Sequence, residues 1–270
     1  DSGNLAGYLV TAREACLEIH KSFVLDSKIT QGLEDSVHVI ESELSATKSN
    51  NPELLSELKT LKNLLKKPVA DTFSDWKKFF NVAHKSFENF KENLRNSNDI
   101  SCWVDACLIQ LTEAQSNIAT LAPCLLDEFK GVAQSLSDNN LLQDKWNQTI
   151  NLLDTNTSYT SLIRNYKLSL IQINAIFVTL NPSSSTAVLL AKFMEIIKTK
   201  VDCIDSLLND AQTAAQFMDH KFSKMNFNFL LEKDREVFTI GYNVREVKFD
   251  SGLYDLLGSE SRLASFLVIA

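Results

Sequence analysis

Glycine and proline are scarce in this 270-residue chain, and their scarcity limits the possible folds more than any other feature. The sequence holds seven glycines and four prolines, and no glycine lies between Gly32 and Gly131. Because these two residue types supply most turns and helix breaks, a chain that lacks them favours long helices. We therefore expect an all-α fold, a multi-helix bundle of long antiparallel helices.

Apolar residues recur at helical spacing along most of the chain, and they predict helices that include residues 4–23, 27–46, 139–153 and 159–180. The clearest stripe follows Asp71, the expected cap, and comprises Phe73, Trp76, Phe80, Ala83, Phe87, Phe90 and Leu94. A longer stripe comprises Leu190, Met194, Ile197, Val201, Ile204, Leu208, Ala211, Ala215 and Met218. It predicts a helix of about 35 residues, or roughly 50 Å. Such stripes must be buried against other helices.

The charge balance argues against a nucleic-acid partner. Acidic residues number 34 and basic residues 27, giving a net charge of −7, whereas phosphate binding needs a basic surface. The basic run at residues 62–67 ends a predicted helix, where cations complement the helix dipole. No apolar stretch is long enough for a membrane span, so we expect none in this fragment.

Metal and cofactor sites are not predicted. The five cysteines show no CxxC spacing and the four histidines are not grouped at metal-ligand spacing. We expect free, buried thiols in a reducing compartment. The sequons at Asn147 and Asn156 are then interpreted as chance matches. No phosphate loop, nucleophile elbow or HExxH motif occurs in residues 1–220, so we expect no catalytic residue there.

The pattern changes near residue 226. One short β-hairpin is predicted near the C-terminus. Its signals are alternating apolar residues, a polar turn at residues 232–236, and β-branched and aromatic residues at 237–242. Gly241 allows a bulge or a close backbone approach. A helical pattern returns after Asp250, the plausible cap. We therefore divide the chain into two parts. Residues 1–221 form a helical linker or scaffold, and residues 222–270 form a second segment with the β-hairpin and the helix that follows it.

This second segment carries a specific sequence pattern: GYNV at residues 241–244 is followed by FDSGLYDLLGSESRLASF at residues 249–266. It resembles the segment that opens the glycoamylase-like domain of cyclic β-1,2-glucan synthases, written there as FLYD, GYN and LDxSYYDLLASEARLASF. The matching positions are Phe229, Leu230, Gly241, Tyr242, Asn243, Asp250, Tyr254, Asp255, Leu256, Leu257, Ser259, Glu260, Arg262, Leu263, Ala264, Ser265 and Phe266. The departures are Leu231-Glu232 for Tyr-Asp, Gly252-Leu253 for Ser-Tyr, and Gly258 and Ser261 for alanines.

The resemblance implies a large, membrane-anchored parent enzyme at the cytoplasmic face of the bacterial inner membrane, which polymerises and cyclises glucose from UDP-glucose. This chain would be a fragment of it, truncated within the glycoamylase-like domain, with other domains of the same polypeptide as partners. Tyr254, Asp255, Glu260 and Arg262 lie close together on a helical pattern and are the candidate substrate-binding residues. Their alternative role is to tie the first helix of that domain to its neighbours.

A glycosidase needs two carboxylates that flank a bond, and the second carboxylate would lie outside the chain. We therefore expect a non-catalytic helical scaffold or linker of a cyclic β-1,2-glucan synthase. Two alternatives are open: a helical module that binds β-1,2-glucan, for which an exposed aromatic platform would be the mark, and an unrelated helical protein-interaction domain.

Overall fold

The computed structural model of the chain describes residues 2–46, 52–67, 71–94 and 98–253. The chain divides into two compact units: Lys21–Ile204 form one, and Asp1–His20 together with Asp205–Ala270 form the other. Almost all regular structure in the described ranges is α-helical, and the strands are confined to residues 231–249. The prediction of an all-α bundle with a short β-hairpin near the C-terminus is confirmed.

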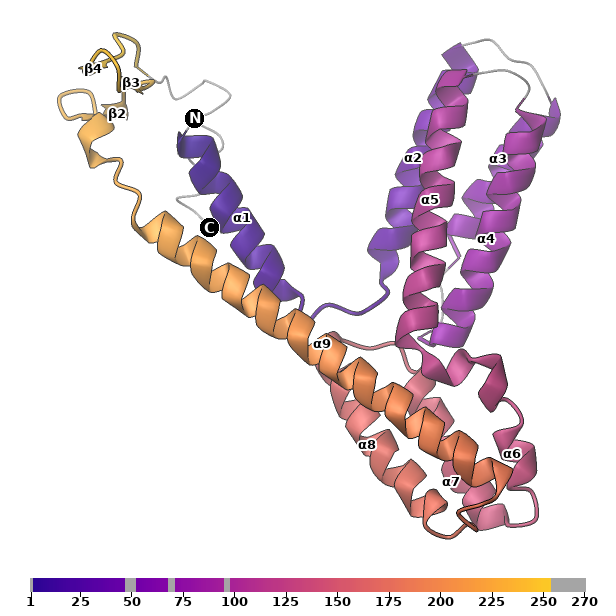
Figure 1. The fold of residues 1–270 in the computed structure, drawn as a ribbon. Helices are drawn as coiled ribbons and strands as arrows, with labels where there is room; N and C mark the ends of the chain where they lie inside the picture. Colours follow the sequence, from indigo (N-terminus) through magenta and orange to yellow (C-terminus); the bar gives the residue numbers. More distant parts are fainter. Residues whose placement is uncertain (1, 47–51, 68–70, 95–97, 254–270) are drawn as a thin grey trace. The chain divides into compact units, whose positions relative to one another are not determined.

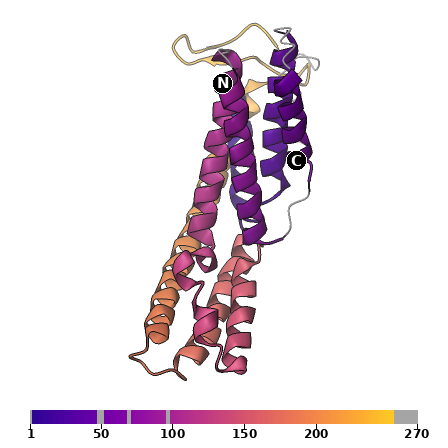
Figure 2. The same cartoon turned by 90° about the vertical axis from the view of Figure 1, so that its right-hand side faces the viewer.

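Within the larger unit, four helices run side by side over much of their length (Figures 1 and 2). They are α2 (Ser27–Ala46), α3 (Pro52–Leu65), α4 (Phe73–Asn93) and α5 (Asn98–Leu121). Contacts join α2 to α3, α3 to α4, α4 to α5, and α2 to α5, which closes the group. Short connections between successive long helices make neighbours antiparallel, as in an up-and-down bundle.

Helix α4 supplies the aromatic centre of this group. All residues of its predicted stripe are buried, and Phe80, Phe87 and Phe90 have no exposed surface. Burying an aromatic or large aliphatic side chain contributes about 1.5–3 kcal/mol, so the stripe fixes which face of α4 turns inward. The expectation that Asp71 caps this helix is wrong. The N-cap is Thr72, whose hydroxyl accepts a hydrogen bond from the backbone N–H of Asp75 at 3.1 Å.

The rest of the larger unit is built from shorter elements and the first part of a long helix. These elements are η1 (Pro123–Leu125), η2 (Asp127–Phe129), α6 (Val132–Ser135), α7 (Asn140–Asp154), α8 (Tyr159–Phe177) and α9 (Ser185–Ser223). The Phe193 ring of α9 lies 4.3 Å from the Phe129 ring and 5.6 Å from the Trp146 ring, centroid to centroid. Met194, expected in the buried stripe, is only half-buried, because the larger Phe193 side chain fills that place.

The smaller unit contains α1 (Ser2–Glu18) and the end of α9. Buried Ala6 on α1 and Ala211 and Ala215 on α9 provide small apolar faces. The guanidinium of Arg13 donates to the carboxylate of Asp219 at 2.8 Å. Helix α1 ends before the expected residue 23, because the chain from Lys21 onward belongs to the larger unit.

Two consecutive hairpins follow α9, where the sequence predicted one. Strand β1 (Leu231–Glu232) pairs with β2 (Val237–Phe238), and β3 (Tyr242–Asn243) pairs with β4 (Lys248–Phe249), both antiparallel. A short 3₁₀ turn, η3 (Asn228–Leu230), precedes them. The hairpins meet at two glycines: a Cβ on Gly241 would lie 2.9 Å from an Asp250 carboxylate oxygen, and one on Gly252 2.6 Å from the Ile240 Cδ1. The close approach expected at Gly241 is therefore present.

Candidate functional site

The residues predicted to bind substrate, Tyr254, Asp255, Glu260 and Arg262, lie outside the described residues. Their role as sugar ligands therefore stays a prediction. The described part of the same sequence pattern begins at Phe229 and ends at Leu253.

The aromatic residues of this pattern come together on the hairpins. The Tyr242 ring packs edge-on against the Phe229 ring at 5.8 Å and against the Phe249 ring at 5.1 Å, centroid to centroid. Such edge-to-face pairs are worth about 0.5–1.5 kcal/mol beyond the area they bury. Phe229 and Phe249 remain about half exposed. The cluster holds β3, β4 and η3 together and leaves two aromatic rings accessible.

Asn243 has a structural role in the second hairpin. Its side-chain oxygen accepts hydrogen bonds from the backbone N–H groups of Arg245 at 3.0 Å and Glu246 at 3.1 Å. This is an Asx turn, in which a side chain replaces a backbone acceptor. The GYN residues of the resemblance thus build the hairpin junction and the turn.

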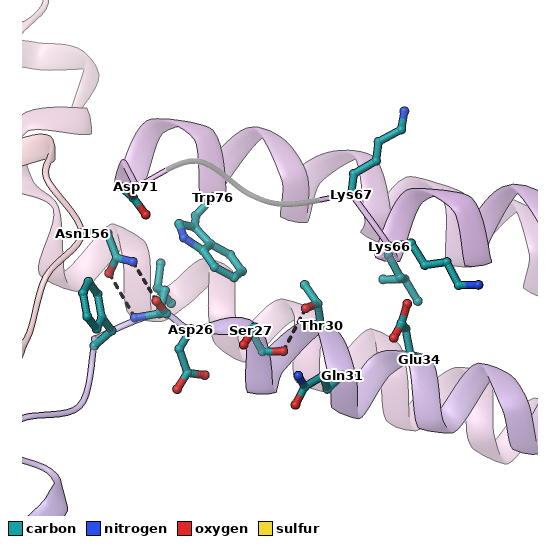
Figure 3. A pocket seen from close by; sticks show the side chains of 13 residues that line it. Asp26, Ser27, Thr30, Gln31, Glu34, Lys66, Lys67, Asp71, Trp76 and Asn156 are labelled. Atoms are coloured by element: carbon teal, nitrogen blue, oxygen red, sulfur yellow. Dashed lines mark hydrogen bonds between the residues drawn. The ribbon is translucent and has the colours of Figure 1, made fainter.

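A groove of about 630 Å³ lies in the larger unit, where α2 begins, α3 ends and α4 begins (Figure 3). Nothing in the sequence predicted it, because it forms where segments far apart in the chain meet. It is lined by Phe23, Leu25, Asp26, Ser27, Thr30, Gln31, Glu34, Leu65, Lys66, Lys67, Asp71, Trp76 and Asn156.

Asn156 fixes one end of the groove. Its side chain is 4 % exposed; the amide oxygen accepts from the Leu25 N–H at 3.1 Å, and the amide nitrogen donates to the Leu25 carbonyl at 2.7 Å (Figure 3). Its backbone N–H donates to the Asp71 carbonyl at 2.9 Å. One residue of the α7–α8 connection therefore joins the segments that precede α2 and α4. A side chain so occupied agrees with the interpretation of its sequon as a chance match.

The helix N-termini at the groove already have hydrogen-bond acceptors. An Asp26 carboxylate oxygen accepts from the Lys28 N–H at 2.9 Å at the start of α2. At the start of α4, an Asp154 carboxylate oxygen accepts from the Ser74 N–H at 2.8 Å. Helix N-termini attract anions through unpaired N–H groups, and these carboxylates take that place.

The buried titratable groups of the larger unit are held in their neutral forms. The pKa of the Cys124 thiol is raised to about 12, first by burial and then by the negative charge of Asp154. Burial also raises the pKa of Tyr166, whose hydroxyl donates to the Leu121 carbonyl. A nucleophilic cysteine needs a lowered pKa and access to solvent, so Cys124 has the opposite properties.

All five cysteines are free, but the expectation that they are buried is only partly correct. Cys107 and Cys124 are buried, whereas Cys102 and Cys203 are exposed. Those two fall on the outward faces of α5 and α9: Cys102 lies two positions before buried Val104, and Cys203 one position before buried Ile204. In the described ranges, no group of three or more His, Cys, Asp or Glu side chains is placed to hold a metal ion.

No described helix is long and apolar enough to cross a membrane. The described residues define the class of the molecule: helical bundles, one of them with a polar groove, and two short β-hairpins after the last helix. No family model matches the sequence. The chain is similar to the cyclic beta-(1,2)-glucan synthase NdvB of Rhizobium meliloti (strain 1021), with 46% identity over 46 residues. The match covers 17% of this chain and only 2% of that protein.

Proposed function

We propose that this chain is a non-catalytic helical scaffold or linker of a cyclic β-1,2-glucan synthase, placed directly before and within the start of a glycoamylase-like domain. The observation that carries the proposal is the GYNV and YDLLxSExRLASF pattern, supported by the 46-residue similarity to NdvB. We infer that the similarity falls on this pattern. The parent enzyme would work at the cytoplasmic face of the bacterial inner membrane.

The contribution of such a scaffold is geometric. Helix α9 has 39 residues, which corresponds to about 58 Å at 1.5 Å per residue. Linking modules in one polypeptide replaces diffusion by a fixed effective concentration. The partners are then the other domains of the same polypeptide. The boundary proposed between residues 221 and 222 lies next to the end of α9 at Ser223.

The test is a turnover assay on the chain itself. It is incubated with linear β-1,2-gluco-oligosaccharides, with and without UDP-glucose, and the chain lengths are followed by mass spectrometry. We expect an unchanged length distribution, identical to that of a sample without protein. New lengths or cyclic products would contradict a non-catalytic role.

The proposed sugar ligands Tyr254, Asp255, Glu260 and Arg262 are tested by binding, because turnover is not expected of them. Asp255→Asn removes a charge at nearly constant shape, and Asp250→Asn is its matched control outside the proposed ligand set. A weaker sugar affinity in Asp255→Asn alone supports ligation. Equal affinity, with a change only in stability, supports the alternative in which these residues join the helix to its neighbours.

A further inference from the structure

The groove between α2, α3 and α4 combines hydrogen-bonding groups of both kinds. Carboxylates of Asp26, Glu34 and Asp71 accept hydrogen bonds, and ammonium groups of Lys66 and Lys67 donate them. Ser27, Thr30 and Gln31 do both. Figure 3 shows Glu34 and Lys66 at one end of the groove and Asn156 and Asp71 at the other, with the Lys67 side chain pointing away from the other labelled side chains.

The charges of the lining disfavour a charged ligand of either sign. An anion would meet three carboxylates, and at each nearby helix N-terminus one N–H group already donates to a carboxylate, that of Asp26 or Asp154. A cation would meet the lysines at the end of α3. A neutral ligand rich in hydroxyl groups uses donors and acceptors together without bringing an unpaired charge to the groove.

An aromatic ring offers the apolar part of such a site. Phe23 lines the groove and is 52% exposed, whereas Trp76, which also lines it, is only 4% exposed. The backbone next to Phe23 is fixed, because the Val24 N–H donates to the Thr157 carbonyl at 3.0 Å. A held but exposed ring can cover the C–H face of a sugar, which is apolar while its edges carry hydroxyls.

We propose that this groove is an oligosaccharide-binding site, in which Phe23 packs against a sugar ring and Glu34 with its polar neighbours binds the hydroxyls. The volume of about 630 Å³ falls within the range of about 300–1,000 Å³ found for small-molecule sites. The choice of a β-1,2-linked glucan as the ligand rests on the proposed function, while the sugar class follows from the lining.

Isothermal titration of the chain with linear β-1,2-gluco-oligosaccharides tests the site, with maltohexaose as the probe of linkage preference. Phe23→Ala should weaken binding about threefold to tenfold, the worth of one aromatic contact. Phe217→Ala is the matched control, because Phe217 is 59% exposed on α9 and is not one of the residues that line the groove. It should leave the affinity unchanged.

A second pair tests the polar contacts. Glu34→Gln replaces a charged acceptor by a neutral one and should weaken binding about threefold. Glu43→Gln, on the same helix but outside the groove lining, should have no effect. A weakening in both groove variants, with both controls unchanged, supports the site. No heat at millimolar sugar of either linkage, or equal effects in variants and controls, overturns it.

The outcome is separable from that of the proposed function. Binding of maltohexaose but not of β-1,2-glucan supports the groove and counts against its link to the glucan synthase family. If the chain shows neither binding nor turnover, the proposal that the groove binds sugar is excluded and the scaffold proposal stands. Turnover would contradict the non-catalytic scaffold role. Whether the groove binds sugar would then be decided by the binding experiment alone.

Discussion

The bundle around α4 and the two hairpins at residues 231–249 differ in almost every physical respect. Phe80, Phe87 and Phe90 of α4 are completely buried, whereas Val244 and Val247 of the second hairpin are 79% and 73% exposed. The hairpin strands are two residues long, and isolated short hairpins are marginal in water. The described part of the sequence pattern that resembles a known family, residues 229–253, therefore lies in short, exposed strands, whereas the buried bundle around α4 lacks such a pattern.

The difference shows that core packing depends on the spacing of apolar side chains, whereas family resemblance depends on particular residues at particular positions. A helical stripe needs only apolar side chains at the right spacing, so many sequences satisfy it. The hairpin junction needs particular residues: Gly241 where Asp250 approaches, and Asn243 to form the turn. Among the described residues that carry the resemblance, Gly241, Asn243 and Asp250 thus have individual geometric tasks.

The largest expected effect is in the bundle. Phe80→Ala removes a fully buried ring from α4 and should lower the free energy of unfolding by about 3–5 kcal/mol. Val82→Ala, on the same helix at 52% exposure, should change it by no more than about 0.5 kcal/mol. Urea denaturation followed by circular dichroism measures both. Equal effects would mean that α4 does not supply the core.

The next effect concerns the connection that closes the groove. Asn156→Ala leaves the backbone N–H and carbonyl of Leu25 without the partners they have at 3.1 and 2.7 Å. The loss of buried hydrogen bonds should cost about 2 kcal/mol. Asn151→Ala, at an exposed position of α7, is the control and should be close to neutral. A neutral Asn156→Ala in the same denaturation assay would contradict the structural role of the amide.

Alkaline pH should destabilise the bundle through Cys124. Its pKa rises from 9.0 in the unfolded chain to about 12 in the folded protein. Between these values the unfolded state loses a proton that the folded state keeps, so stability is full below pH 9 and falls as the pH rises, by at most about 1.4 kcal/mol per pH unit. Denaturation at about pH 8 and about pH 10 should show a loss to which Cys124 contributes about 1 kcal/mol. Cys124→Ala should remove that part, whereas Cys107, whose pKa is also raised by burial, keeps its own contribution.

The control for this pH effect is Cys102→Ala, because Cys102 is exposed. Its pH dependence should equal that of the unsubstituted protein. If Cys124→Ala keeps the full loss at alkaline pH, the thiol is not the titrating group.

The smallest effect is a local gain in the second hairpin. Val247 has φ 50°, a left-handed conformation that costs a β-branched residue about 1–2 kcal/mol. Val247→Gly should therefore stabilise the β3–β4 hairpin by about 1 kcal/mol. The exchange rate of the Asp250 amide, which donates to the Gly241 carbonyl at 3.0 Å, measures this. Val244→Gly, in the same turn, should give no gain, and equal slowing by both substitutions would exclude relief of strain.

Much of the fold could be predicted from the sequence because helical periodicity is local. The stripe of α4 and the uninterrupted run of α9 place their buried faces correctly. Local patterns do not decide between neighbours that both fit, so Met194 was expected where Phe193 is buried, and Asp71 where Thr72 is the cap. The second hairpin, with strands at 242–243 and 248–249, was missed because residues 237–242 were assigned to a single strand and the residues up to Asp250 to no element.

The groove lay beyond prediction for a different reason. Its walls come from Phe23 to Glu34, Leu65 to Lys67, Asp71 to Trp76, and Asn156, and their meeting depends on how the helices pack. No spacing within the sequence contains that information. The exposure of Phe23 could not be predicted either. A large aromatic side chain is usually buried, and only the packing of its neighbours leaves this one exposed.

Hydrogen exchange measured by mass spectrometry across the whole chain tests the central contrast most directly. Amides of α4 and α5 should exchange only through global unfolding, and those of residues 231–249 through local opening, with rates at least about a thousandfold faster. Slow exchange in the hairpins, equal to that of α4, would contradict the account, because the family-like segment would then have stability comparable to that of the bundle.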